Sequence, residues 1–208
     1  MSSIFKGLKT KGIPYKLFSD KKCFIKTQKG LLYDTITNEK IDILYKTHPW
    51  YSIYRNLKNL KEGKKAKRNF YEFFLNKKTK IVEPMWKTVM GNKALLPYVY
   101  SLHKDCKYLI PSSFDPFDEC FGDDEYIIEK GLMGRGSMMT KKVKRSEITK
   151  KNPNVIYQKI FKGNYVDNNY YIMGSWIVGD KFSGMFVKQS NTMINEYSCN
   201  VIPVRILL

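Results

Sequence analysis

Short runs of alternating apolar and polar residues recur along the chain, and each run predicts a β-strand. Residues 31–33 and 41–45 are two such runs, joined by the turn-rich stretch 37–40, and they predict a hairpin. In the second half, apolar runs predict strands over 126–130, 155–161, 171–178, 182–187 and 201–207. Gly179 and Asp180 form a pair typical of a hairpin turn between the third and fourth of these strands.

Apolar side chains at helical spacing predict three helices. The first begins at about Pro49, has apolar residues at positions 50, 53, 54, 57 and 60, and ends near residue 60. A short aromatic helix is predicted over 70–75. Asn92 is the predicted N-cap of the third helix, which carries apolar and aromatic residues at 96, 99 and 100. We interpret His103, near its end, as a structural residue.

The remaining segments predict connections and short strands. Residues 80–84 predict a strand that leads into a loop, and 108–110 predict another strand. An acidic loop is predicted over 115–125, and a basic loop or short helix over 141–154. No repeat and no linker rich in Pro, Gly or Ser occurs, so we expect a single unit over 1–208, with a mixed hairpin and helix portion over 1–80 and a second portion over 81–208.

The positive charge is large, with 37 Lys and Arg against 19 Asp and Glu and a net charge of +18. One interpretation is attraction to nucleic acid, to an acidic partner or to a phosphate ligand. The other is compositional drift, because the excess is nearly all lysine and accompanies many Asn, Ile and Tyr residues. We favour drift, with non-specific attraction to polyanions as a by-product.

Several classes of protein are disfavoured by composition. The four cysteines lie far apart without a C-x-x-C pair, and two histidines are too few to predict a zinc site. No run of eighteen apolar residues and no apolar signal segment at the N-terminus occurs. We therefore expect a protein of the cytoplasm, or of a phage-like particle made there, with free thiols.

Two lysines accompany a glycine-rich loop. Lys130 ends a predicted strand, and Gly134, Arg135 and Gly136 follow it, while Lys93 lies on a separate predicted element. Glycines let backbone N–H groups approach phosphate oxygens, and the cations supply countercharge. A glycine cluster alone is most often a turn, and a strand-end lysine is most often solvated. The pattern departs from the Rossmann spacing and from the P-loop.

Longer segments make the lysine pair more specific. EPMWKTVMGNKALLP (83–97), YIIEKGLMGRG (126–136), and VIYQ (155–158) followed by GSWIVGDKFSGMFVKQS (174–190) resemble successive segments of the ATP-grasp synthetase domain of glutathionylspermidine synthases. GLLYDTITNEKIDILYKTHPW (30–50) is similar to an earlier segment. The resemblance runs in consistent order from about Lys11 to the C-terminus.

The resemblance implies an α+β, ATP-grasp-like fold with a largely antiparallel sheet, flanking helices, and less than the full family domain. It implies an ATP-dependent ligase that joins a carboxylate to an amine. By position, the implied ATP-binding residues are Lys93 and Lys130 at the phosphates, Gly134, Arg135 and Gly136 in the loop that covers them, and Gln158 in the strand beside the adenine. Lys188 and Arg135 are the implied catalytic residues.

The chain also departs from the family pattern. Gly131 stands where the family has proline, and Lys188-Gln189 replaces an Arg-Glu pair, although lysine lacks the bidentate guanidinium. The family's magnesium and glutathione segments precede the matched region, so we predict no metal ligands in this chain. ATP is the expected cofactor.

Three hypotheses follow. In the first, the chain is the ATP-binding half of a ligase, and a partner chain supplies the metal and glutathione site. In the second, it is a catalytically inactive ATP-grasp-derived module with a structural role, for example in a phage particle. In the third, suggested only by the charge, it associates with nucleic acid. We place the first slightly ahead of the second.

Overall fold

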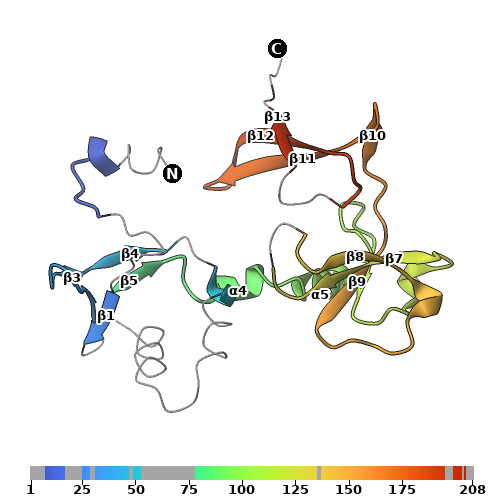
Figure 1. Ribbon diagram of the computed structural model, residues 1–208, viewed down its shortest axis with the longest axis horizontal. Coiled ribbons are helices and arrows are strands. Elements are labelled where there is room, and N and C mark those ends of the chain that lie inside the picture. The colour runs from blue at the N-terminus through green and yellow to red at the C-terminus, as the bar shows by residue number, and fades with distance from the viewer. Residues whose placement is uncertain are drawn as a thin grey trace. The chain divides into compact units, whose positions relative to one another are not determined.

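The computed structural model describes residues 8–16, 25–28, 31–46, 49–52, 78–134, 137–194, 199–202 and 204. Figure 1 shows the course of the chain through them. The chain groups into two compact units, Met1–Met85 and Trp86–Leu208. The described strands pair mainly antiparallel and the helices are few, as expected for an α+β fold. The single unit over 1–208 stays a prediction.

The described residues of the first unit form two small sheets. β1 (Ile25–Gln28), β2 (Leu31–Asp34) and β3 (Lys40–Ile41) form an antiparallel sheet in that order. The predicted hairpin is therefore confirmed for β2 and β3 but ends at Ile41. The following run forms a separate strand, β4 (Ile43–Tyr45), which pairs parallel with β5 (Lys80–Val82). The predicted strand before residue 84 is thus confirmed as well.

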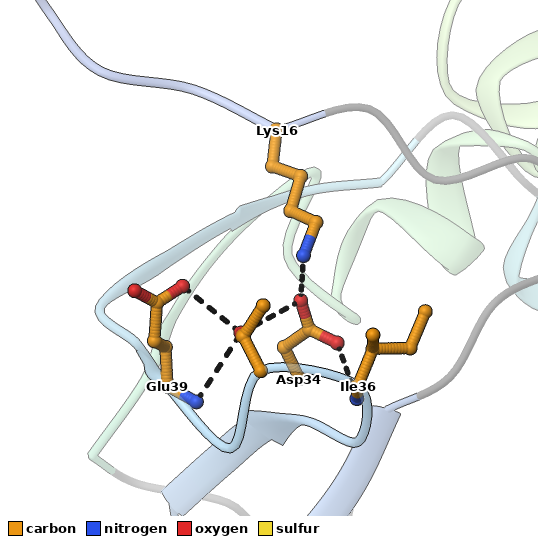
Figure 2. A network of polar contacts seen from close by, with 5 residues as sticks. Lys16, Asp34, Ile36 and Glu39 are labelled. Carbon is orange, nitrogen blue, oxygen red and sulfur yellow. Dashed lines mark hydrogen bonds and ion pairs between the residues drawn. The ribbon is translucent and has the colours of Figure 1, made fainter.

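Asp34 organises the turn between β2 and β3 (Figure 2). Its buried carboxylate accepts hydrogen bonds from the Ile36 amide at 2.8 Å and the Thr37 hydroxyl at 3.1 Å, and it forms an ion pair with Lys16. The same hydroxyl lies 2.9 Å from Glu39 Oε2, so its single hydrogen is shared between the two carboxylates. A carboxylate that accepts several hydrogen bonds favours its charged form, and the pKa of Asp34 falls to about 2, chiefly because of Lys16 and the Ile36 amide.

Trp50 connects distant parts of the first unit. It is buried, starts the described helical turn at 50–52, and donates its indole N–H to the Glu83 carbonyl oxygen at 2.7 Å. The Lys46 ammonium lies 4.3 Å from the centre of its ring, a cation–π distance. The predicted helix start is confirmed, and the rest of that helix lies outside the described residues.

The second unit contains a four-stranded sheet in the order β6-β9-β7-β8. These strands are β6 (Ser112–Ser113), β7 (Tyr126–Gly131), β8 (Thr140–Lys144) and β9 (Val155–Gln158), and every pairing is antiparallel. One face carries a core of Phe121, Ile127, Val155 and Tyr157. Phe121 comes from the short 3-10 helix η2 (Glu119–Phe121), which begins where Asp118 accepts a hydrogen bond from the Cys120 amide.

In the second unit, the described helices before this sheet are α4 (Lys87–Met90) and α5 (Leu95–Leu102), and α5 contacts β6. Asn92 accepts a hydrogen bond from the Ala94 amide through Oδ1 at 2.9 Å in the turn before α5, but the N-cap residue of the helix is Ala94 rather than the predicted Asn92. His103 follows the helix as its C-cap residue and is exposed.

A second antiparallel sheet has the order β10-β11-β12-β13. It comprises β10 (Asn164–Val166), β11 (Asn169–Val178), β12 (Lys181–Ser190) and β13 (Asn200–Ile202). Gly179 and Asp180 join β11 to β12 with φ angles of 56° and 62°. Positive φ at both central residues is the type I′ signature, so the predicted turn is confirmed. β10 was not predicted.

Three predictions for the second unit are wrong in whole or in part. Residues 108–109 form turns, in which the Leu109 amide donates to the Cys106 carbonyl oxygen, so the strand begins only at Ser112. The prediction of a basic loop or short helix over 141–154 is wrong for Lys141–Lys144, which belong to β8. It is confirmed for 145–154, which contain the 3-10 helix η3 (Arg145–Glu147) and a loop. β9 ends at Gln158, before the predicted limit of 161. The acidic segment 115–125 is a connection containing η2.

Some predictions lie outside the described residues, namely the helix over 70–75 and most of 203–207. In the described part of the chain, no helix has both the length and the apolar character that a membrane span requires.

Candidate functional site

The face of the β6-β9-β7-β8 sheet opposite the core carries a polar cluster. Side chains alternate along a strand, so Ile128 and Lys130 of β7 share a face opposite to that of Ile127. Gln158 of β9 lies directly across from Ile128 on one side and Ser112 of β6 on the other. The register therefore brings Lys130, Gln158 and Ser112 into one patch. We call this patch, together with Lys93, the Lys130 cluster.

Lys93 reaches this patch from the turn before α5 and is held at two points. Its backbone amide donates to the Leu132 carbonyl oxygen at 2.8 Å, two residues beyond Lys130. Its side-chain ammonium donates to the Gly134 carbonyl oxygen at 3.1 Å. Both acceptors belong to the loop that leaves β7. The structure thus brings together the two lysines that the sequence places 37 positions apart.

Lys130 is half-buried beside the buried side chains of Ile128 and Ile156. Removal of water disfavours a charged ammonium. Burial therefore lowers the pKa of Lys130, and the positive charge of Lys93 lowers it further. Burial also lowers the pKa of Lys93. The two ammonium groups lie near enough to repel each other, which is unfavourable unless an anion lies between them.

Gln158 supports Lys130 through its amide. The Lys130 ammonium donates to Gln158 Oε1, and Gln158 Nε2 donates to Ser112 Oγ at 2.9 Å. The Gln158 and Ser112 side chains are more than nine-tenths buried. Both ends of the Gln158 amide thus contact protein groups. The predicted contact of Gln158 with an adenine ring stays a prediction. Ser112 was not predicted, because no motif marks it and only strand register reveals its neighbours.

Gly131 allows the loop between β7 and β8 to close. Its amide donates to the Met139 carbonyl oxygen at 2.8 Å, and a Cβ on it would lie 2.9 Å from the Met139 Cβ. Proline, which the family has here, supplies no N–H donor. Gly134 in the same loop has a φ of 139°. Arg135 and Gly136 lie outside the described residues, so their predicted contacts with phosphate stay predictions.

Lys188 lies on β12 in the other sheet of this unit, across from Ile172 and Val201. Its ammonium is 6.0 Å from the centre of the Phe186 ring. The structure does not place it in the Lys130 cluster, and its catalytic role stays a prediction.

The chemistry of the cluster is that of an anion site. Two ammonium groups converge from separate elements, and the loop between β7 and β8 accepts a hydrogen bond from the Lys93 ammonium. Charge-assisted hydrogen bonds to phosphate oxygens are among the strong polar contacts of proteins. Within the described residues, no group of three or more His, Cys, Asp or Glu side chains is placed to hold a metal ion. The described cluster therefore has the charge expected of a site for an anionic ligand.

Comparison with known families gives an independent finding. Residues 9–207 match the family described as glutathionylspermidine synthase preATP-grasp. The match includes every residue of the Lys130 cluster, and it extends through both compact units.

Individual relatives are similar at low identity. A protein named "Putative acid--amine ligase" from Haemophilus influenzae is 26% identical over 182 residues, which is 81% of this chain and 42% of that protein. Trypanothione synthetase of Crithidia fasciculata is 29% identical over 60% of this chain and 20% of its own length. Glutathionylspermidine synthase of the same organism is 21% identical over 82% of this chain and 30% of its own length. The chain thus spans less than half of each.

Proposed function

Since the chain belongs to the glutathionylspermidine synthase preATP-grasp family, a family of ATP-dependent amine ligases, we propose that it binds the phosphates of ATP for amide-bond formation between a carboxylate and an amine. The observation that carries the proposal is the convergence of Lys93 and Lys130 beside the loop that leaves β7. We propose an ATP-grasp-like fold for this chain, in which both lysines lie at the phosphates, as the resemblance of the segments implies.

Each ammonium has a distinct part in the proposed site. Lys130 is oriented by Gln158, and Lys93 is attached by its backbone to the loop itself. Together they would neutralise phosphate charge from two sides, with Arg135 as a third cation from the loop. ATP would supply the phosphoryl group that activates the carboxylate. The protein's contribution is to orient the phosphates and offset their charge, as in other phosphoryl transfers.

Other parts of the reaction are proposed to lie on protein outside these 208 residues, on a partner chain. The metal and glutathione sites are the expected missing parts. An exposed apolar hairpin supports this proposal, since Trp176, Ile177, Val178 and Phe182, at the end of β11 and the start of β12, are each about 60% exposed. Exposed apolar patches commonly mark interaction surfaces.

Affinity purification of the full chain tests the proposed partner. Recovery of a partner chain would support the proposal, and an active ligase reconstituted from this chain alone would contradict it.

Substitution of Lys130 by alanine tests the phosphate site. Hydrogen bonds to charged groups contribute roughly 1.5–3 kcal/mol, so Lys130→Ala is expected to raise the Kd for ATP by about tenfold or more. Titration calorimetry on the full chain measures this. Lys181→Ala is the matched control, because Lys181 is an exposed lysine of β12 whose removal changes net charge equally. Equal ATP affinity of the Lys130→Ala and Lys181→Ala variants would contradict the assignment.

A further inference from the structure

Ser112 makes hydrogen bonds in two directions. Its hydroxyl donates to the Ile110 carbonyl oxygen at 2.8 Å and accepts from Gln158 Nε2 at 2.9 Å. Gln158 Oε1 in turn accepts from the Lys130 ammonium. A continuous chain of hydrogen bonds therefore runs from the backbone before β6, across β9, to the ammonium on β7.

The direction of this chain determines how the Gln158 amide is oriented. A serine hydroxyl has one hydrogen. Because that hydrogen is used on Ile110, the Ser112 oxygen is left to accept, and Gln158 must turn its NH2 group toward it. The amide oxygen then faces Lys130. The reversed amide would direct N–H donors at an ammonium group, which has no acceptor.

Burial makes the arrangement specific. Ser112 is 4% exposed and Gln158 is 6% exposed, so water has little access to replace a lost partner. A buried donor left unpaired is costly, and the amide therefore depends on Ser112 for its orientation.

We propose that Ser112 is a positioning residue of the anion site, which acts through Gln158 to keep an amide oxygen on the Lys130 ammonium. Its consequence for nucleotide binding rests on the proposed function, but its effect on Lys130 does not. The charged group that faces Lys130 from another element is Lys93, which opposes the charge of Lys130. Glu129 is on the opposite face of β7, where it pairs with Lys141 at 3.2 Å. The Gln158 oxygen is thus the described group that favours a charged Lys130.

The reactivity of Lys130 toward limiting acetic anhydride tests the proposal on the full chain without nucleotide. Only the neutral amine reacts, so loss of the amide oxygen should raise the reaction rate of Lys130 at pH 8. In Ser112→Ala we expect the rate, measured by mass spectrometry relative to Lys181, to rise about three- to tenfold, equivalent to a pKa decrease of about half to one unit. Ser112→Thr keeps the hydroxyl and is expected to restore the wild-type ratio.

A second variant guards against misfolding of the first. Gln158→Met removes the amide at similar length and is expected to raise the Lys130 ratio as Ser112→Ala does. An unchanged ratio in either variant, or a Ser112→Thr ratio equal to that of Ser112→Ala, would overturn the positioning role. Calorimetry with inorganic triphosphate separates this outcome from the proposed function, since a wild-type chain that binds no triphosphate contradicts only the latter.

Discussion

Two half-buried ammonium groups side by side make the Lys130 cluster sensitive to pH. The pKa of Lys130 is lowered by burial and by Lys93, and that of Lys93 by burial. A bound polyanion favours both charged forms, so binding takes up protons once the pH exceeds the lowered pKa values. The affinity for inorganic triphosphate should therefore fall as pH rises toward the ordinary lysine pKa of 10.5.

Calorimetry at several pH values and in buffers of different ionisation enthalpy measures this proton uptake. Lys130→Ala should show a weaker pH dependence than Lys181→Ala. A pH-independent affinity in the wild-type chain would contradict a site made of these two lysines.

Asp34 gives the first unit a separate dependence on pH. Its pKa in the folded chain is about 2, below the usual 3.8, so its contribution to stability is present above about pH 4 and lost as the pH falls toward 2. Carbon-13 NMR titration of the carboxylate measures the value directly. Lys16→Ala should raise the pKa, because Lys16 makes the largest contribution to lowering it. An Asp34 pKa near 3.8 in the wild-type chain would contradict the network in Figure 2.

The sequence was informative about residues that carry a motif and uninformative about those that do not. The proximity of Lys93 and Lys130 could be predicted, because the segments around each lysine resemble successive segments of one family. Ser112 could not, because its role depends on the register that places it opposite Gln158. Register is a property of paired strands, which local patterns specify only indirectly.

At the scale of elements, β8 illustrates why a strand can be missed. Its sequence, TKKVK, has one apolar residue, Val143, which pairs with Ile127 and packs against the core. Neighbouring lysines take up cross-strand partners instead, such as Lys141 with Glu129 and Lys142 over the Tyr126 ring. Pairing with β7 thus overrides a composition that predicts a loop. The β11–β12 hairpin was easier to predict because Gly179 and Asp180 specify its turn.

The close contact of Gly131 with Met139 predicts the effect of restoring the family's proline. Gly131→Pro removes the donor to the Met139 carbonyl oxygen and places Cβ against that side chain. Loss of a buried hydrogen bond costs about 1–3 kcal/mol, so the free energy of unfolding should fall by about that amount. Chemical denaturation measures it.

A matched change separates the two causes at Gly131. Gly131→Ala keeps the N–H donor and adds only the Cβ, so it should destabilise less than proline. A proline variant as stable as the wild type would show that this loop closes differently from the arrangement described here.

At the scale of the whole molecule, the net charge of +18 attracts polyanions with or without a specific site. Attraction of that kind weakens steeply with salt and depends little on which lysine is removed. A built site behaves differently, because it depends on particular ammonium groups. Any measurement of nucleotide binding must therefore be made at physiological salt and compared across lysines.

We propose that Lys93 and Lys130 together bind the phosphates of a nucleotide. The family match through residues 9–207 and the position of the cluster within the second unit support this proposal. A double-mutant cycle on ATP binding tests it most directly. It compares the wild type, Lys93→Ala, Lys130→Ala and the double variant by calorimetry at physiological salt, with AMP as the short-phosphate ligand. We predict that ATP binds more tightly than AMP, that each single variant loses about tenfold or more in ATP affinity, and that the two losses are not additive. Equal ATP affinity in all four proteins would contradict the claim.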